Sequence, residues 1–212
     1  MPWSPSPVEI VRDAKLTRFE VWSPKRAERL TLFSHEALAL WVMIEATPSI
    51  ANFCPYPGFL VLNEEDRRAQ LVDFWLRRDA KDECLLLRDA PRLSTVSRHS
   101  ARRLPAQWKN VVRWIESSEL AAHEQWVRNW LQILPYLTSN RALIDAVLRE
   151  RILEHLGSDT RRLTEIEAAE APTDPMVTRT AVFDLIRLGR IDAPALRSEP
   201  LCGALALQRA AA

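Results

Sequence analysis

The chain has 212 residues, enough for one large domain or two small ones with a buried core. Its formal net charge is +1, so no global field draws it to nucleic acid, and any such affinity must come from local patches. No apolar run approaches the roughly 20 residues of a membrane helix. Three cysteines without a CxxC pair are typical of a reducing compartment, so we expect a cytoplasmic protein.

A helix is predicted from Ser34 to Ala46. Ser34 is a good N-cap, and Thr47 followed by Pro48 stops the helix. Apolar residues cover much of its circumference, so we expect it to be buried on more than one side. Before it, in a proline-rich and charged stretch, Phe19–Trp22 is a possible short strand.

A small mixed sheet is predicted beside this helix. Its strands are rich in apolar and β-branched residues, and a strongly charged segment between two of them indicates a hairpin loop. The expected strands are 59–62, 71–76 and 83–88, with the loop at 63–70, a basic helical segment at 95–107 and a last strand at 110–115, whose spacing also suits a helix.

Helices dominate the rest of the sequence. A helix is predicted over 118–134, ended by Pro135, and a second over 141–156, capped by Ser139 or Asn140 and stopped by Gly157. A short helix at 160–169, a helix at 175–188 capped by Thr173 or Asp174, and two short extended arms follow. This order is typical of a winged-helix domain. We therefore expect two domains, 1–117 and 118–212.

Two carboxylates are candidate metal ligands. Glu36 stands in the first turn of the predicted helix, and Asp73 lies in the predicted strand 71–76. Oxygen ligands of this kind hold Mg²⁺ or Mn²⁺, and such a metal polarises a phosphate and activates water for phosphodiester hydrolysis. The alternative is that both are surface carboxylates, with Glu36 serving the helix dipole.

The order of these motifs resembles the amino-terminal half of the TnsA-type transposon endonucleases. Those proteins have a PD-(D/E)XK restriction-endonuclease-like fold and act beside a DDE-type transposase. The resemblance implies an α/β (α+β) protein, with a mixed sheet flanked by helices and a helical, winged-helix-like second domain. It also implies that Glu36 and Asp73 are metal ligands for Mg²⁺ or Mn²⁺. The matching segments are Ser34-His-Glu36, Ile44-Glu-Ala-Thr-Pro48-Ser-Ile50, Phe53-Cys-Pro-Tyr-Pro57 and Val72-Asp73-Phe74.

The strand after Asp73 departs from the family pattern. Where the family has Glu or Gln, then any residue, then Lys, this sequence has Leu86 and Arg88. Arg88 takes the third catalytic position but cannot lose its proton near neutral pH. Loss of a metal ligand and of the lysine removes interactions made in the transition state. Glu83 or Asp89 could substitute if the register differs by a residue or two.

A basic stretch is the candidate DNA-binding region. Two tryptophans, Trp108 and Trp114, are interleaved with its cations, as in surfaces that combine phosphate contacts with base stacking. The alternative is a solvated charged face with both tryptophans in the core, and the stripe His123, Trp126 and Trp130 is also expected to be core. The candidate DNA-binding residues are Arg98, Arg102, Arg103, Lys109 and Arg113.

The resemblance implies a TnsA-like protein of a DNA transposition system. We expect it to bind transposon-end DNA, a DDE-type transposase and an AAA regulator, and to contribute assembly rather than cleavage. Two alternatives remain open at this point. One is an active metal-dependent endonuclease that cuts the second strand at transposon ends. The other is a winged-helix regulator or defence protein without catalysis.

Overall fold

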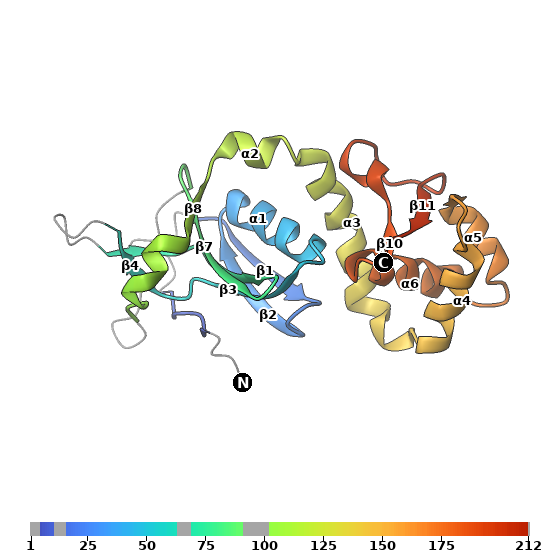
Figure 1. Cartoon of the computed structure of the whole chain (residues 1–212), viewed down its shortest axis with the longest axis horizontal. Coiled ribbons are helices and arrows are strands. Elements are labelled where there is room, and N and C mark those ends of the chain that lie inside the picture. The colour runs from blue at the N-terminus through green and yellow to red at the C-terminus, as the bar shows by residue number, and fades with distance from the viewer. Residues whose placement is uncertain (1–4, 11–15, 63–68, 91–101, 212) are drawn as a thin grey trace. The chain divides into compact units, whose positions relative to one another are not determined.

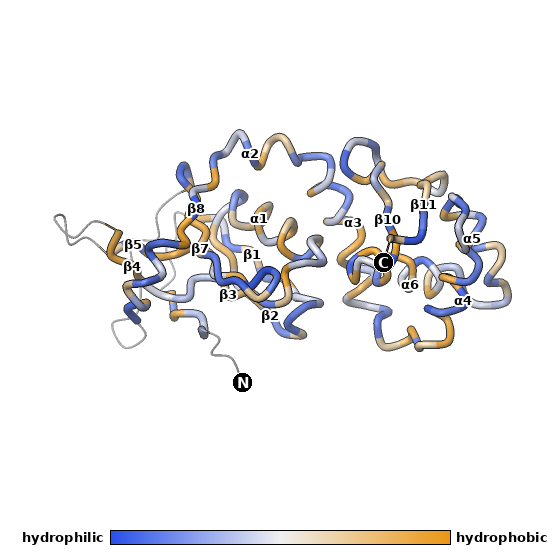
Figure 2. The backbone as a smooth tube through the Cα atoms, viewed as in Figure 1, coloured by the Kyte–Doolittle hydropathy of each residue, from blue (hydrophilic) through white to orange (hydrophobic). Residues whose placement is uncertain are grey.

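The computed structural model describes residues 5–10, 16–62, 69–90 and 102–211. The chain forms two compact units. The first comprises residues 1–44 and 49–122, and the second residues 45–48 and 123–212. Both units contain helices and strands (Figure 1), and polar and apolar stretches alternate along each of them (Figure 2). The fold is therefore mixed α and β, as the sequence predicts.

The first unit opens with a β-hairpin that runs directly into a helix. Strand β1 (Arg18–Ser23) pairs antiparallel with β2 (Glu28–Phe33), and α1 (His35–Ala46) follows. The Ser34 Oγ accepts a hydrogen bond from the Ala37 N–H at 3.1 Å, which confirms Ser34 as the N-cap. The helix is buried on several sides, as expected, and Trp41 is 2% exposed.

A four-stranded mixed sheet forms the centre of this unit. Its strand order is β3-β6-β7-β8, in which β7 and β8 are parallel and the other neighbours are antiparallel. A separate antiparallel pair, β4 and β5, lies between β3 and β6 in the sequence. The strands are β3 (Ile50–Pro55), β4 (Phe59–Val61), β5 (Ala69–Leu71), β6 (Phe74–Arg78), β7 (Lys81–Leu87) and β8 (Val112–Ile115).

Two predicted elements of this unit differ from the structure. The strand expected over 71–76 is two strands, because the chain leaves β5 after Leu71 and β6 begins at Phe74. Asp73 therefore lies in the break between strands rather than within one. Of the basic helix expected over 95–107, residues 95–101 lie outside the described residues, and a 3₁₀ helix, η1, occupies Ala106–Val111.

In the second unit, Pro135 does not end its helix. The helix expected over 118–134 is two helices: α2 (Ser117–Ala121), which belongs to the first unit, and α3 (Glu124–Asn140), which contains Pro135. Ile133, Leu134 and Leu137 are buried along one side of α3, and this packing stabilises the helix on both sides of the proline. The next helix, α4 (Ala146–Leu156), begins later than predicted, after the short 3₁₀ helix η2 (Arg141–Leu143).

Asp145, rather than Ser139 or Asn140, caps α4, since its Oδ1 accepts from the Leu148 N–H at 2.7 Å. The later caps agree with the sequence: Asp174 accepts from the Met176 N–H at 2.7 Å. A three-stranded antiparallel sheet of order β10-β11-β9 completes the unit. Its elements are β9 (Arg161–Arg162), α5 (Leu163–Ala169), α6 (Pro175–Arg187), β10 (Ile191–Asp192), the 3₁₀ helix η3 (Pro194–Arg197) and β11 (Ala206–Arg209).

Among the described residues, none of the helices has the length and apolar character needed to cross a membrane.

Candidate functional site

Asp73 is bound to its surroundings by both backbone and side chain. Its N–H donates to the Leu85 carbonyl at 3.1 Å, and its own carbonyl accepts from the Tyr56 N–H at 2.8 Å. Its carboxylate Oδ2 accepts from the Leu87 N–H at 2.7 Å. The carboxylate thus takes the place of a backbone acceptor for the Leu87 N–H in the break between β5 and β6. Part of its hydrogen-bonding capacity is therefore used to hold the fold.

Glu36 and Asp73 are linked through Tyr56. The Phe33 N–H donates to the Tyr56 hydroxyl oxygen at 3.0 Å, and Phe33 lies two residues before His35, where α1 begins. The backbone of Tyr56 meets Asp73, so one buried tyrosine connects the start of the Glu36 helix to the strand break. Burial raises the pKa of the Tyr56 phenol well above its usual range, with the nearby Asp73 carboxylate adding to the effect.

Glu36 itself is half-buried in the first turn of α1. Its carboxylate has no hydrogen bond or ion pair with any residue that the structure describes. Its place near the helix N-terminus favours a negative charge there. This position suits the ligand role that the resemblance implies, and equally the surface role.

The pairing register of β6 and β7 places a hydrocarbon side chain beside Asp73. Phe74 pairs with Leu85, so Asp73 comes opposite Leu86. Leu86 has no exposed surface and packs in a cluster that includes Val72, Trp75 and Trp108. The register therefore puts a buried hydrocarbon side chain, Leu86, opposite Asp73.

Arg88, just beyond β7, is engaged elsewhere. Its Nε lies 2.5 Å from the Glu116 carboxylate, and its guanidinium sits over the Trp114 ring, 5.1 Å from the centroid. The Arg88 N–H donates to the Ile115 carbonyl at 3.0 Å. These contacts join the residues that follow β7 to β8 and α2, and they hold the cation in an exposed ion pair.

The residues present do not fit a nuclease metal centre. Within the described ranges, no three His, Cys, Asp or Glu side chains converge as a metal-binding group. Glu83 pairs with Leu76 in the register, three positions and about 10 Å along β7 from Leu86, and lies 4.0 Å from Arg113. Asp89 accepts from the Ser117 N–H at 3.4 Å. Neither carboxylate takes the place opposite Asp73.

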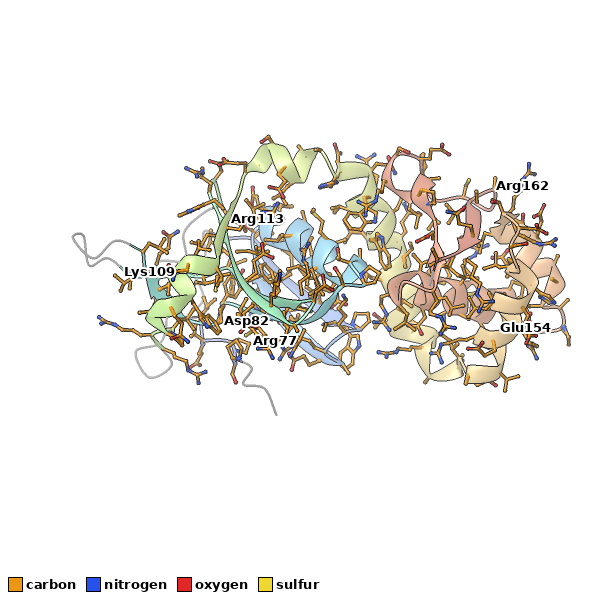
Figure 3. The ribbon with its side chains drawn as sticks, in the orientation of Figure 1. Arg77, Asp82, Lys109, Arg113, Glu154 and Arg162 are labelled. Carbon is orange, nitrogen blue, oxygen red and sulfur yellow. The ribbon has the colours of Figure 1, made fainter. Side chains whose placement is uncertain are left out.

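The basic stretch is organised by two inward-facing residues. Leu104 and Trp108 are 7% and 6% exposed, and Trp108 stacks on Trp75 with ring centroids 6.0 Å apart. The residues around them are exposed, among them Arg102, Arg103 and Lys109. Figure 3 labels Lys109 on η1 and Arg113 on β8. Arg98 lies outside the described residues.

Two residues of the basic stretch have partners within the protein. Trp108 belongs to the core, because its stacking on Trp75 buries it, and it presents no face to a base. Arg113 is paired with the carboxylate of Glu119 and lies near Glu83. Arg102, Arg103, Lys109 and Arg113 are all exposed, so the candidate DNA-binding residues that the structure describes are accessible to solvent.

In the second unit, α6 is a core helix. Every residue from Thr178 to Arg187 except Arg179 is buried, and the helix packs against α3, α4 and α5. Arg187, 7% exposed, and Arg149 both bind the buried Asp184 carboxylate through two nitrogens each. The Arg179 Nε donates to Glu167 at 2.6 Å. Within Thr178–Arg187, Arg179 alone is half-exposed.

The connection between β10 and β11 is fixed by Asn129, which the sequence did not single out. Asn129 has no exposed surface, and its Nδ2 donates to the carbonyls of Leu196 at 2.8 Å and Glu199 at 2.7 Å. Its Oδ1 accepts from the Leu201 N–H at 2.9 Å. Arg197 lies over the Trp126 ring at 4.3 Å. A lone polar residue inside the Trp126–Trp130 stripe was the available signal.

From the sequence, Tyr56 was expected only as part of a Pro-Tyr-Pro turn. Its linking role depends on contacts with distant residues and could not be read from local spacing. Neither a protein-family model nor a curated protein sequence matches the chain. The resemblance to TnsA-type endonucleases consequently stands on the motif order and on the residues described above.

Proposed function

We propose that the chain is a TnsA-like protein of a DNA transposition system that binds transposon-end DNA and does not cut it. A DDE-type transposase and an AAA regulator are its proposed partners. The observation that carries the proposal is the register that sets the buried Leu86 opposite Asp73. It combines the strand arrangement of a nuclease site with a side chain that cannot bind a metal.

The loss of cleavage follows from the chemistry of two positions. Leu86 offers no oxygen to a divalent cation, so Glu36 and Asp73 would have to hold it without a third protein ligand. Arg88 stays protonated and is paired with Glu116, so it is unavailable to orient the attacking water. Each missing transition-state contact is worth about 3 kcal/mol of barrier, or roughly a hundredfold in rate.

DNA binding is supported by the exposed cations next to the core. Leu104 and Trp108 anchor the segment, and Arg102, Arg103 and Lys109 are turned to solvent around them. Phosphate contacts require exposed Arg or Lys on a fixed backbone, and this segment supplies both. Its backbone is fixed by the Leu104 N–H, which donates to the Phe59 carbonyl at 2.8 Å.

The finer fold assignment belongs to the same proposal. A mixed sheet with an antiparallel β6–β7 hairpin, next to a helix that carries a carboxylate in its first turn, supports a restriction-endonuclease-like first domain. The order α4, β9, α5, α6, β10, β11 with sheet order β10-β11-β9 supports a winged-helix-like second domain. Since α6 is buried, this domain serves in assembly rather than in base readout.

Cleavage is tested with supercoiled plasmid and with duplex transposon ends, in Mg²⁺ and in Mn²⁺. We expect no nicking above a protein-free control. Metal-dependent nicking that disappears in Glu36→Ala and Asp73→Ala would establish an active endonuclease and overturn the non-cleaving assignment. Arg128→Ala is the matched control, because Arg128 is an exposed residue of the second unit with an ordinary surface ion pair.

DNA binding is tested by fluorescence anisotropy on a blunt duplex of about 30 base pairs, close to three helical turns. Replacing Arg102, Arg103 and Lys109 together by Gln should reduce the dependence of log K on log salt by about 2.7 for three phosphate contacts. Arg128→Gln should leave that slope unchanged. An unchanged slope in the triple variant would remove this segment from the DNA interface.

The transposition role has a separate test. Genes for a DDE-type transposase and an AAA ATPase should lie beside the gene for this chain, and the purified proteins should form a complex on end DNA. DNA binding without any interaction with such partners would support a binding protein outside transposition.

A further inference from the structure

A groove lies on one face of the β1–β2 hairpin, apart from the basic segment around η1. Its volume is about 390 Å³, within the range of ligand sites in proteins. Residues 7–10 line one side of it, and the Val8 N–H donates to the Tyr56 carbonyl at 2.8 Å, which fixes this side to the end of β3. The groove is therefore built from three segments that hydrogen bonds hold together.

The hairpin register explains which side chains form its floor. Arg18 pairs with Phe33, and the alternate residues Arg29 and Thr31 of β2 point to the same face as Phe33. All four line the groove. One end is aromatic, where Phe33 meets Tyr56 with ring centroids 6.0 Å apart. The rest of the lining combines apolar residues with two cations and two acids: Pro7, Val8, Ile10, Leu30, Arg18, Arg29, Glu9 and Glu28.

Trp22 extends this face beyond Arg29. The two residues are direct cross-strand partners, so their side chains lie on the same face as neighbours. Trp22 is 40% exposed, and its ring makes no aromatic or cation–π contact with any described residue. An exposed tryptophan in a strand next to a groove offers an open surface for stacking.

Arg29 is the available cation of the groove. Arg18 is paired with Glu20, and Glu28 with Arg26. Glu9, which also lines the groove, has a partner of its own. Within the described ranges, Arg29 has no ion pair or side-chain hydrogen bond, and it is exposed. Its charge is thus left for a ligand that carries negative charge.

The aromatic end of the groove meets the residues that organise the candidate site. Phe33 and Tyr56 line the groove, and the hydrogen bond between them is the one that connects α1 to the Asp73 segment. A nucleic-acid strand that lies along Trp22 and Arg29 therefore ends near the residues that connect the segments of Glu36 and Asp73. Alternating stacking and phosphate-binding groups along a groove are typical of sites for single-stranded nucleic acid.

We propose that this groove, with Trp22 and Arg29 at its mouth, binds the single-stranded extension of a DNA end. Trp22 stacks on a base, and Arg29 contacts a phosphate next to it. This inference rests on the proposed DNA-binding function and adds a second contact, separate from Arg102, Arg103 and Lys109. It assigns the hairpin to the strand extension and the η1 region to the duplex.

The test compares a blunt duplex with the same duplex carrying a short single-stranded tail, measured by fluorescence anisotropy. The tailed DNA should bind about tenfold more tightly, and both Trp22→Leu and Arg29→Gln should abolish that gain while leaving blunt-duplex affinity unchanged. The two variants should differ in salt dependence. Arg29→Gln lowers the slope for tailed DNA by about 0.7, whereas Trp22→Leu leaves the slope unaltered because no charge is lost.

Both replaced side chains are exposed, so the variants should keep the far-ultraviolet circular dichroism and the melting temperature of the parent. Arg128→Gln again serves as the charge-matched control. Equal affinity for blunt and tailed DNA would overturn the groove assignment while leaving duplex binding intact. Displacement of the tail by a free mononucleotide at the same concentration as the oligonucleotide would overturn it in favour of a small-molecule site. Failure to bind either DNA would remove the proposed function as well.

Discussion

The Tyr56 hydroxyl accepts the backbone N–H of Phe33 at 3.0 Å, and this bond joins the end of β3 to the residue two positions before α1. Both residues are buried. The same tyrosine meets Asp73 through its backbone. One residue, Tyr56, therefore connects the two segments that carry Glu36 and Asp73.

Tyr56→Phe tests this relation. The ring is kept and the acceptor is lost, so the Phe33 N–H stays buried without its partner, at a cost of about 1–3 kcal/mol in the free energy of unfolding. Urea denaturation measures the change. Tyr136→Phe is the control, since Tyr136 only accepts a long 3.4 Å contact from Arg179, and it should cost under about 1 kcal/mol. Equal losses in the two variants would contradict the linking role.

Leu86→Glu should destabilise the protein by more than about 3 kcal/mol, because it places a carboxylate in a core cluster opposite Asp73. On the ligand role that the resemblance implies for Glu36 and Asp73, a glutamate at position 86 would add a third oxygen, and millimolar Mn²⁺ should then recover about 1–3 kcal/mol in this variant and none in the parent. Leu86→Met, which keeps the volume, should cost under about 1.5 kcal/mol. If Leu86→Glu and Leu86→Met were equally stable, position 86 would not be in the core.

Asp184→Asn should cost about 3–5 kcal/mol in the free energy of unfolding. The change removes the charge that Arg149 and Arg187 share, and Arg187 is only 7% exposed, so its guanidinium stays buried without a counter-charge. Thermal and urea unfolding measure the loss. Glu124→Gln, at an exposed ion pair with Arg128, should change stability by less than about 0.5 kcal/mol. A comparable effect of both substitutions would argue against a buried ion network.

Asn129→Ala should release the β10–β11 connection. Three hydrogen bonds to the backbone of residues 196–201 are lost, and the expected cost exceeds about 3 kcal/mol. Hydrogen exchange of the Leu201 amide should accelerate more than that of α4 amides. Asn129→Asp, which keeps the acceptor oxygen, should retain more protection at Leu201. Uniform acceleration across the unit in both variants would count against a local clamp.

Two buried thiols make stability depend on alkaline pH. Burial raises the pKa of Cys54 and of Cys84 from 9.0 to about 12. Both remain protonated in the folded state at pH values where the unfolded chain has lost its thiol protons. Their contribution is therefore complete below about pH 9 and falls as pH rises towards 12, by up to about 1.4 kcal/mol per thiol per pH unit.

Urea unfolding as a function of pH checks this dependence. Cys54→Ala with Cys84→Ala should flatten the alkaline limb, although Tyr56 keeps part of it. Cys202→Ser should leave it unchanged, because Cys202 is exposed. In the native protein a thiol reagent should modify Cys202 first and leave the other two protected. Rapid modification of all three cysteines would contradict their burial.

Local signals in the sequence predicted the elements that carry their own caps. Ser34 and Asp174 begin helices where expected, and Gly157 ends α4 with a positive φ of 52°. The exceptions lie where tertiary packing decides. Pro135 is tolerated because α3 is held by its buried side, and Asp73 leaves the strand because its carboxylate replaces a backbone partner at Leu87.

The candidate site shows the same division. The absence of a carboxylate at Leu86 was visible in the sequence, and the β6–β7 register shows which residue Leu86 lies opposite. Which of the aromatic and basic residues are buried could not be predicted from the sequence. Trp108 and Trp114 have similar neighbours in the sequence, yet Trp108 stacks inside the core while Trp114 lies half-buried under Arg88. Which of two such residues is exposed depends on partners far away in the chain.

The strand order β10-β11-β9 also governs the order in which the second unit can be completed during synthesis. The central strand, β11, is the last of the three to be made, and β9 and β10 pair only with it. A nascent chain that has reached β10 holds both outer strands without a partner. The three strands can therefore pair only once residue 209 has been added. Until then, the helices made earlier lack this sheet as a neighbour.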